Sequence, residues 1–376
     1  MIISIFGLGV VGSSFYNIFK NKSKVITFTR KNKFNCKLNK TFSTYKKLFV
    51  KNNIFVELIG GVNCVIEIIL NSIKNKCNYV TANKEFISKY SFFLNFLFKK
   101  HNIKIFYEAS VGGSLPLIRL IINYYFNNKI LYCINILNGT TNFILTNLIK
   151  SNFKKLINLS IKKGFAENNY SNDLLGLDLL FKHSILFSLL FKKFFCYFKF
   201  NLESTFGTNN FLKKNFYIKK YLTILVNINN NIFSVISIFL TKNVFLYKTK
   251  NSLNLTLLNY KNFKKHILIA PGAGAEETGE TVNIDLINVF KKKYFNNYKC
   301  LNNFFLLSNI YSCFNLIMYL KIDYNYLYII KIFKIKIIKF YINKKVVLKT
   351  KKNFYKKILF FLYYIKNSNF YISKFI

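Results

Sequence analysis

The sequence predicts an α/β protein in which a domain built on a parallel sheet precedes an α+β domain. Three observations support this prediction. Before residue 115, short apolar runs of strand length alternate with helical stretches; the first run leads into a glycine-rich turn; and beyond residue 115 a long apolar helix and strand-like runs replace the alternation. Alternating strands and helices are typical of a parallel sheet, because each parallel crossover needs a helix-length connection.

The first element is a short buried strand at residues 2–6, followed by a glycine-rich turn. Gly7-Leu8-Gly9-Val10-Val11-Gly12 has the spacing G-x-G-x-x-G, a helical stretch runs to Phe19, and residues 25–29 form a second predicted strand. In a Rossmann-type dinucleotide-binding fold, the first two glycines permit a tight turn close to the pyrophosphate, and the third lets the helix pack on the sheet. This context favours a dinucleotide site over a purely structural turn.

The end of the second predicted strand bears on the choice of cofactor. An acid is expected there to bind a ribose 2′-hydroxyl, but Thr29-Arg30-Lys31 occupies the place. Arg30 can accept a 2′-phosphate, which favours NADP(H) and leaves NAD(H) possible. The alternative is that Arg30 is a solvated surface residue.

The remaining strands of the first domain each end at a polar or glycine-containing segment. Residues 54–59 precede Gly60-Gly61, residues 78–80 precede Thr81-Ala82-Asn83-Lys84, and residues 103–107 precede Glu108. Ligands of open α/β sheets bind at the carboxyl ends of the strands. In the second domain we expect a helix over 174–195 and strands over 221–227 and 232–240.

Charge and cysteine usage exclude several function classes. Lys and Arg total 57 against 13 acids, which gives +44, but the lysines are spread over the whole chain and only Arg30 and Arg119 are arginines. We interpret this as compositional drift rather than a nucleic-acid interface, although a basic nucleic-acid or membrane-surface binder on a decayed scaffold remains the competing hypothesis. No apolar run is long enough to span a bilayer, and no signal peptide is apparent. The seven scattered cysteines fit reduced thiols in a cytoplasmic protein.

Residues that resist this drift are clustered. Thirteen of the 14 glycines, both prolines and ten of the 13 acids fall in seven short segments of the chain. Glycine permits close ligand approach, and carboxylates supply ligands and charge. Folding alone does not explain such confinement, so these segments are the candidate functional regions.

Read in order, the segments resemble the homoserine dehydrogenase family over about residues 2–290. The segments that carry the resemblance are Gly7–Gly12, Val56–Gly61, Thr81–Lys84, Tyr107–Gly113, Leu137–Asn142, Gly164–Lys182 and Gly272–Thr278. The segments at 137–142 and 164–182 are the most specific. The family resemblance implies reduction of L-aspartate 4-semialdehyde to L-homoserine with NAD(P)H, in threonine and methionine biosynthesis, by a homodimer. Because no kinase domain precedes residue 1, we expect the monofunctional form.

The resemblance also implies roles for individual residues. It implies cofactor contacts at Gly7, Gly9, Val10, Val11, Gly12, Gly60, Thr81, Lys84, Gly164 and Gly274. A monovalent cation, Na+, is implied at Glu108 and the carbonyls of Val111, Gly113 and Leu115. Glu167 and Asp178 match substrate-binding carboxylates, and Lys182 matches a proton donor.

The chemistry of these residue types agrees with the implied reaction. Hydride delivery to an aldehyde builds an alkoxide, which needs a nearby cation or acid, and Lys84 and Lys182 are the candidates. Asp178 and Lys182 are four apart in an apolar helix, so the carboxylate can orient the amine; the alternative is an ordinary exposed ion pair. For Glu108 the alternative is a helix cap, and for Asp173 capping is the expected role.

Three departures from the family pattern lead to further expectations. Asn168-Asn169-Tyr170 replaces the usual Pro-Asp-Pro, which predicts a less rigid substrate loop, and Asn135 replaces a glycine, where we expect a left-handed turn. Residues 300–376 form a degenerate ACT-like or packing segment with no Gly, no Pro and one acid, Asp323, so we expect little inhibition by threonine.

The expected domains are three. Residues 1–114, completed by about 270–290, bind the nucleotide; residues 115–269 serve substrate binding and dimerisation; and residues 300–376 form the ACT-like or packing segment.

Overall fold

The computed structural model describes most of the chain up to residue 291 and four short strands beyond it. The described residues are 2–19, 24–28, 41–42, 49, 54–90, 94, 101–125, 130–148, 150–166, 170–191, 205, 218–228, 231–241, 243–260, 265–291, 316–321, 337–341, 345–350 and 374–375. Arg30 and Glu167 lie outside these residues, as do Asn168 and Asn169.

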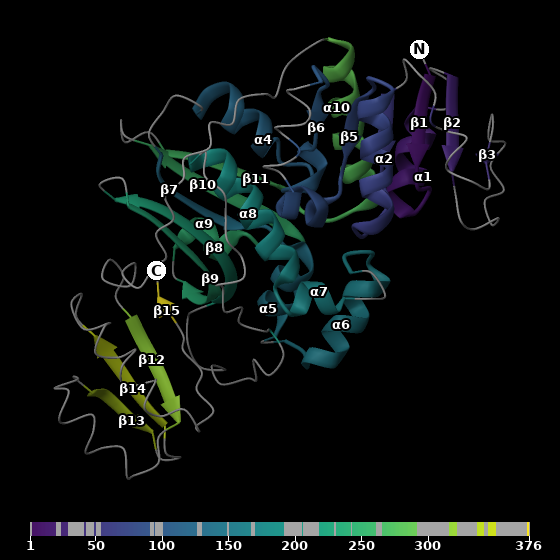
Figure 1. Cartoon of the computed structure of the whole chain (residues 1–376). Helices are drawn as coiled ribbons and strands as arrows, with labels where there is room; N and C mark the ends of the chain where they lie inside the picture. The colour runs from purple at the N-terminus through teal and green to yellow at the C-terminus, as the bar shows by residue number, and fades with distance from the viewer. Residues whose placement is uncertain are drawn as a thin grey trace.

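The first half of the molecule, built mainly from residues 2–106, forms a parallel sheet (Figure 1). Its strands are β1 (Ile2–Phe6), β2 (Lys24–Phe28), β3 (Thr41–Phe42), β4 (Ile54–Glu57), β5 (Asn78–Thr81) and β6 (Ile105–Phe106), in the order β3-β2-β1-β4-β5-β6. All five pairings are parallel. This order is that of a doubly wound dinucleotide-binding sheet, in which the order of the strands reverses between the first and the fourth strand. The predicted α/β fold class is therefore confirmed.

Helices connect and cover these strands. They are α1 (Val10–Phe19), α2 (Asn63–Lys74), the helical residues 84–90, the 3₁₀ turn η2 (Glu108–Ser110), and α10 (Ala275–Phe290) from much later in the chain. α10 packs against α1 and η2 and reaches β5 and β6, so residues near both ends of the described core share one layer. Buried apolar side chains of these helices and strands belong to one continuous hydrophobic cluster that extends into the second half.

The second half is a mixed sheet with helices on it. Its strands are β7 (Ile130–Ile136), β8 (Ile218–Ile228), β9 (Asn231–Thr241), β10 (Leu253–Tyr260), β11 (Lys265–Pro271) and β15 (Lys374–Phe375), in the order β11-β10-β7-β8-β9-β15. All neighbours are antiparallel except β15, which pairs with β9 in parallel. The helices are α4 (Leu117–Leu120), the π-helical turn η3 (Ile121–Tyr125), α5 (Gly139–Asn147), α6 (Phe153–Lys162), α7 (Ser171–Leu174), α8 (Leu177–Phe191) and α9 (Val244–Lys248).

A smaller antiparallel sheet lies nearer the C-terminus. It consists of β12 (Leu316–Lys321), β13 (Ile337–Tyr341) and β14 (Lys345–Thr350), in the order β12-β14-β13. All three strands lie within residues 300–376, the segment expected to be ACT-like or a packing segment. Whether this sheet belongs to an ACT-like domain stays a prediction.

Two predicted elements end earlier than expected. The strand expected over 54–59 ends at Glu57. The Leu58 N–H still donates to the Phe6 carbonyl of β1 (2.8 Å), but the next N–H, that of Ile59, donates to the Glu57 carboxylate (2.7 Å). The helix expected over 174–195 is divided at Gly176, whose φ of 79° is left-handed, so that α7 and α8 are separate helices. The strands expected at 221–227 and 232–240 are confirmed as β8 and β9.

Asn135 was expected in a left-handed turn, and this expectation is wrong. Asn135 is fully buried within β7, pairs with Thr223 of β8, and donates its amide to the Thr223 hydroxyl (3.0 Å). The amide side chain is accommodated by this hydrogen bond inside the sheet, so no unusual backbone angle is needed.

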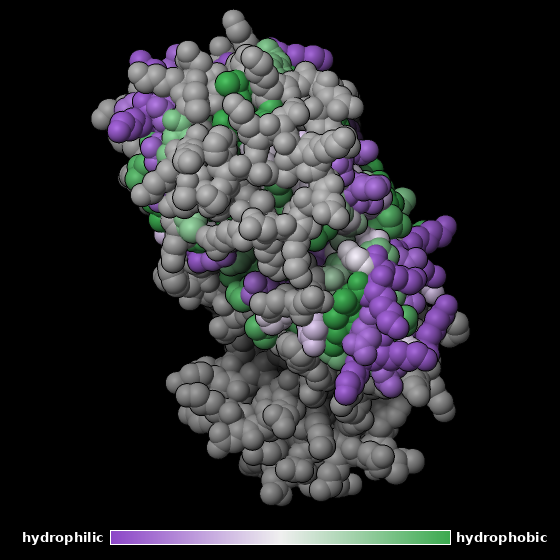
Figure 2. Space-filling model, turned by 90° about the vertical axis from the view of Figure 1, so that its right-hand side faces the viewer, coloured by the Kyte–Doolittle hydropathy of each residue, from purple (hydrophilic) through white to green (hydrophobic). Residues whose placement is uncertain are grey.

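The surface of the described residues mixes polar and apolar side chains. On the face shown in Figure 2, apolar and hydrophilic side chains are interspersed. No helix among the described residues is long and apolar enough to cross a membrane. Described Cys64, Cys77 and Cys133 are free thiols, as expected for these three positions.

Candidate active site between the two halves

The glycine-rich turn lies where the parallel sheet reverses its strand order, between β1 and β4. Gly7 has φ of 101°, and a Cβ there would lie 2.8 Å from the Leu58 carbonyl oxygen. A Cβ on Gly12 would collide with the Gly7 carbonyl, so the helix approaches the turn only because Gly12 has no side chain. Gly9 differs, since no heavy atom lies within 4 Å of its Cβ position. The turn therefore leaves open space at Gly9, which fits close approach of a pyrophosphate.

The neighbouring residues of α1 agree with a ligand at this turn. Val10 begins the helix and is 75% exposed, although it is apolar, whereas Val11 is half-buried. A cofactor lying over the first turn of α1 would cover Val10. The helix N-terminus also presents unpaired N–H groups that suit phosphate oxygens.

The carboxyl ends of β4 and β5 carry a buried polar network. The Glu57 carboxylate accepts the Ile59 N–H and the Thr81 hydroxyl, each at 2.7 Å, and Thr81 in turn accepts the Asn83 N–H (2.9 Å). The side chain of Thr81 is thus used within the protein. Gly60 leaves space around its Cβ position, with no heavy atom within 4 Å. This turn therefore offers main-chain groups rather than the Thr81 hydroxyl to a cofactor.

Two other predicted cofactor contacts lie at the edges of the site. Gly164 has φ of 70° and no heavy atom within 4 Å of its Cβ position, and the adjacent Phe165 carbonyl accepts the Thr140 hydroxyl (2.6 Å). That hydrogen bond joins the two most specific sequence segments. Gly274 caps α10, and the carboxylate of Glu277 fills the space that a Cβ would need. An anionic phosphate is disfavoured beside this carboxylate, so a contact at Gly274 fits an uncharged part of a nucleotide.

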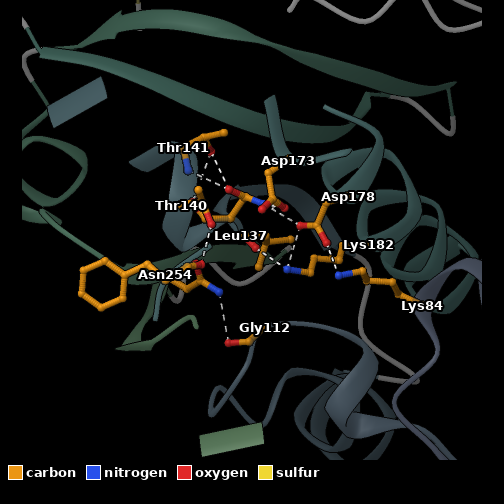
Figure 3. A network of polar contacts seen from close by, with 11 residues as sticks. Lys84, Gly112, Leu137, Thr140, Thr141, Asp173, Asp178, Lys182 and Asn254 are labelled. Carbon is orange, nitrogen blue, oxygen red and sulfur yellow. Dashed lines mark hydrogen bonds and ion pairs between the residues drawn. The ribbon is translucent and has the colours of Figure 1, made fainter. Parts of the chain in front are cut away.

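The centre of the site is the carboxylate of Asp178 near the start of α8, which two lysines and an amide surround (Figure 3). Lys182, one helical turn later, pairs with it at 2.9 Å, and Lys84 pairs with it from the parallel-sheet half. Asn138 donates its amide to the same carboxylate (2.8 Å). The predicted i,i+4 arrangement is confirmed, but the pair is buried: the side chains of Asp178 and Lys182 are 2% and 10% exposed. An ordinary surface ion pair is excluded here.

Burial and charge act in opposite directions on the pKa values of this pair. Burial alone would raise the pKa of Asp178, but the ammonium groups of Lys182 and Lys84 outweigh it and hold that pKa well below its usual range. The pKa of Lys182 is lowered, because burial disfavours its charged form and Lys84 repels it, while Asp178 only partly compensates. A lysine with a lowered pKa is better suited to transfer a proton near neutral pH than an exposed one.

The position of Lys182 is also fixed from the β7–α5 connection. Its ammonium donates to the Leu137 carbonyl at 2.7 Å, and the next residue, Asn138, caps α5 through the Thr141 N–H (2.8 Å). Asn138 also donates to Asp173 (2.8 Å), whose pKa is raised by burial and by the neighbouring Asp178. Asp173 was expected to cap a helix; it is instead a second carboxylate of the site.

The Glu108 side chain, which was predicted to belong to a cation site, already has partners within the protein. Both carboxylate oxygens are occupied: one accepts the Ile118 N–H (2.8 Å), and the other accepts the Arg119 N–H (2.8 Å) and the Arg119 guanidinium (3.2 Å). The Glu108 carboxylate therefore holds the start of α4, and each of its oxygens already has a partner within the protein. This agrees with the capping alternative for that residue.

The turn that follows carries the main-chain carbonyls of the predicted cation site, those of Val111, Gly113 and Leu115. Gly112 and Gly113 have φ of 84° and 66°, so the chain turns tightly between Val111 and Leu115. Some of these oxygens already accept one hydrogen bond, as Gly113 does from Thr281 (3.1 Å), but a carbonyl has two lone pairs. Among the described residues there is no cluster of three or more His, Cys, Asp or Glu side chains that could hold a metal.

Several functional residues were not singled out from the sequence. Asn138 and the Leu137 carbonyl stand within a recognised segment, but their direct contacts with Asp178 and Lys182 depend on elements far apart in the chain. Asp285 of α10 accepts the Glu108 N–H (2.8 Å), and its pKa is raised by burial and by the charge of Glu108. Its membership of an acid-containing segment was the only signal. His183, beside Lys182, is buried and contacts Ser234 at 2.5 Å.

Comparisons with known proteins indicate one family. A family model for the homoserine dehydrogenase NAD-binding domain matches residues 7–108, and a model for homoserine dehydrogenase matches residues 116–287. The homoserine dehydrogenase of Lactococcus lactis is 28% identical over 260 residues, covering 65% of this chain and 61% of the relative. That of Methanocaldococcus jannaschii is 30% identical over 232 residues, covering 59% of this chain and 67% of the relative.

Solved structures show the same fold. A homoserine dehydrogenase from Thiobacillus denitrificans has a TM-score of 0.82 at 18% identity, covering 100% of this chain and 98% of that one. A hyperthermophilic archaeal homoserine dehydrogenase mutant in complex with NADPH has a TM-score of 0.65 at 20% identity, covering 79% and 99%.

The extent of these matches defines what they establish. The chain spans about three fifths of the length of the Lactococcus lactis and Bacillus subtilis relatives, 61% and 57%. It covers 67% of a relative that is 30% identical, and the two matched domains follow each other along the chain with the buried Asp178 pairing Lys84 of one and Lys182 of the other. The resemblance seen in the sequence is confirmed: the chain belongs to the homoserine dehydrogenase family.

Proposed function

We propose that this protein is an NAD(P)-dependent oxidoreductase that interconverts L-aspartate 4-semialdehyde and L-homoserine, a step in threonine and methionine biosynthesis. The observation that carries the proposal is the buried Asp178–Lys182 pair, held by the Leu137 carbonyl and contacted by Lys84 from the nucleotide-binding half. A bound nicotinamide cofactor would supply the hydride. The chain's own residues must then neutralise the alkoxide that forms on the aldehyde oxygen.

Lys182 is the proposed proton donor in the direction of reduction. Asp178 orients its amine, the Leu137 carbonyl accepts one of its protons, and another is free to pass to the substrate oxygen. In the reverse direction the neutral amine would take a proton from the homoserine hydroxyl. The lowered pKa of Lys182 favours both directions near neutral pH, because each protonation state is then accessible.

Lys84 and the carboxylates divide the remaining roles. Lys84, whose side chain is 43% exposed, is proposed as a second catalytic cation and as a cofactor contact. Glu167 is proposed to bind the substrate ammonium. Asp178 already has three partners, so it would contact substrate only after one of them moves, and the exposed Lys84 is the easier to displace.

The direct test is oxidation of NADPH and NADH by the purified full-length chain with aspartate semialdehyde. Turnover that depends on the aldehyde supports the proposal, and absence of turnover with both cofactors would refute it. A salt-titrated DNA-binding assay tests the competing binder hypothesis, since real phosphate binding gives a steep dependence of log affinity on log salt concentration.

We propose NADP(H) as the preferred cofactor, with NAD(H) possible, because Arg30 stands where an acid would otherwise bind the ribose 2′-hydroxyl. Arg30→Asp should shift the ratio of kcat/KM for NADPH over NADH toward NADH by about tenfold or more, since a carboxylate would face the 2′-phosphate. Arg30→Lys, which keeps the charge, is the matched control. An unchanged ratio in Arg30→Asp would make Arg30 a surface residue.

We further propose that Na+ binds main-chain carbonyls of the 108–115 turn, those of Val111, Gly113 and Leu115, with Glu108 contributing only its own carbonyl. Replacing NaCl with choline chloride at constant ionic strength should lower the thermal midpoint if the site exists. A homodimer in the cytoplasm, with no nucleic-acid or membrane partner, completes the proposal. Size-exclusion chromatography with light scattering tests the dimer.

A further inference from the structure

Asn83 uses every polar atom of its side chain, and the partners lie on two different segments. Its amide nitrogen donates to the carbonyls of Ile59 (3.0 Å) and Gly61 (2.7 Å), on the turn after β4. Its amide oxygen accepts the Phe86 N–H (2.9 Å), which caps the helical residues 84–90. Asn83 is 8% exposed, so water does not easily replace these partners.

The 59–61 turn, which Asn83 hydrogen-bonds, is also held by Glu57. Glu57, which is fully buried, accepts the Ile59 N–H, and the Asn83 amide donates to the Ile59 carbonyl. Thr81 joins the two, because its hydroxyl donates to Glu57 and accepts the Asn83 N–H. Both main-chain groups of Ile59 are therefore bound, and the position of the 59–61 turn depends on these three side chains.

The other end of this network is the catalytic lysine. Lys84 follows Asn83 directly, begins the helical residues 84–90, and reaches Asp178 in the other half of the molecule. Asn83 both caps this helix and hydrogen-bonds the 59–61 turn. A shift of the turn would therefore move the start of the helix and, with it, the backbone position of Lys84. Gly60, in the middle of the gripped turn, faces open space.

We propose that Asn83 is a positioning residue that couples the 59–61 turn to Lys84, so that cofactor bound at the turn and the ammonium beside Asp178 are set by one side chain. The identity of the ligand at the turn rests on the proposed function; the coupling rests on the hydrogen bonds of Asn83. This coupling role of Asn83 goes beyond helix capping and packing.

The choice of variants follows from the two functions of the amide. Asn83→Asp keeps an oxygen to cap the Phe86 N–H, but it loses both donors and places a carboxylate oxygen against two carbonyls. Asn83→Ser also keeps a good cap but is too short to reach the turn. The control is Asn152→Asp, because Asn152 caps α6 through the Lys155 N–H (2.8 Å), is exposed, and touches neither segment.

The kinetic experiment uses the full chain and measures the NADPH Kd, kcat and the thermal midpoint. Asn83→Asp and Asn83→Ser should each raise the NADPH Kd and lower kcat about tenfold, the scale expected when buried acceptors lose their donors. Asn152→Asp should leave both within about twofold. In a Lys84→Met background, Asn83→Asp should lower kcat little further, because residues that act as a unit are not additive. Fully additive losses, or losses matched by Asn152→Asp, would overturn the proposal.

A second measurement is independent of the reaction. Labelling of Lys84 by an amine-reactive reagent, followed by mass spectrometry, should be several-fold faster in both Asn83 variants than in the unmodified chain, because the ammonium is no longer held at Asp178. Unchanged labelling together with unchanged NADPH affinity would overturn the coupling. If the unmodified chain neither binds NADPH nor turns over, the proposed function fails, and Lys84 labelling alone then decides the inference.

Discussion

Asp178 and Glu57 are both buried carboxylates at the same site, but their surroundings give them opposite properties. Asp178 is paired with two lysines, and these hold its pKa well below the usual range despite burial. Glu57 accepts only neutral donors, from Ile59, Thr81 and Tyr79, and burial raises its pKa to about 7. The first carboxylate remains charged and pairs with Lys182, the proposed proton donor, whereas the second organises a turn. Burial alone therefore does not decide whether a buried carboxylate stays charged; the charge of its partners does.

Glu108 lies between these extremes. It has one cation, Arg119, and two main-chain donors, yet burial still raises its pKa to about 7. One guanidinium does not outweigh complete burial, whereas two ammonium groups do. The number of cations around each carboxylate thus separates Asp178, whose pKa is lowered, from Glu57 and Glu108, whose pKa values are raised.

The largest effect is expected for Lys182→Ala. Removing the proposed donor should lower kcat at least ~100-fold, while NADPH binding stays nearly intact because Lys182 lies in the substrate half. Steady-state kinetics and a fluorescence titration with NADPH measure the two quantities. A nearly normal kcat would assign the acid role to Lys84 or to water, and the comparison with Glu57 would lose its basis.

Asp178→Asn should have the next largest effect, with kcat falling some tens-fold. Without the carboxylate, Lys182 loses the charge that partly restores its pKa, so the alkaline limb of the kcat–pH profile should move to lower pH. The matched control is Glu85→Gln, which breaks a half-buried i,i+4 pair with Lys89 (2.5 Å) in the helical residues 84–90. If both substitutions leave the profile unchanged, Asp178 is only a structural partner of Lys182.

Glu57→Gln should change the pH dependence of stability. The pKa of Glu57 is raised to about 7 in the folded protein, so its contribution to stability is present below its unfolded pKa of about 4.5 and is lost as pH rises through about 7. The unmodified chain should therefore lose about 2 kcal/mol of unfolding free energy between pH 5 and pH 8 that Glu57→Gln does not lose. Urea unfolding at both pH values measures the difference, and parallel pH curves would show that Glu57 does not titrate in this range.

Local sequence patterns were sufficient for the first βαβ unit and for the pair on α8. The Gly7–Gly12 turn lies between β1 and α1 as expected, since the glycine spacing between an apolar run and a helical stretch is a local pattern that marks a tight strand-to-helix turn. Asp178 and Lys182 share one helical face, which follows from their spacing alone. These features depend on residues close together in the chain.

Long-range contacts account for the differences. The strand expected to continue to residue 59 stops at Glu57. The Leu58 N–H still bonds the Phe6 carbonyl of β1, but the Ile59 N–H donates to the Glu57 carboxylate instead of to a neighbouring strand. The helix expected from 174 is interrupted at Gly176, while the Leu174 carbonyl accepts the N–H of Thr205, which lies far along the chain. No periodicity in a single segment encodes such partners.

The sequence by itself determined the residue types of the site, because clustered glycines and acids stand out in a lysine-rich chain. It also determined the dinucleotide-binding fold, through the alternation of strands and helices. Only the tertiary structure decided what each carboxylate does. Asp178 became the ionised centre because Lys84 arrives from the other half, and Glu108 became a helix cap because α4 begins beside it. The pKa of a buried acid is set by the charges that folding brings to it, and those charges lie far away in the sequence.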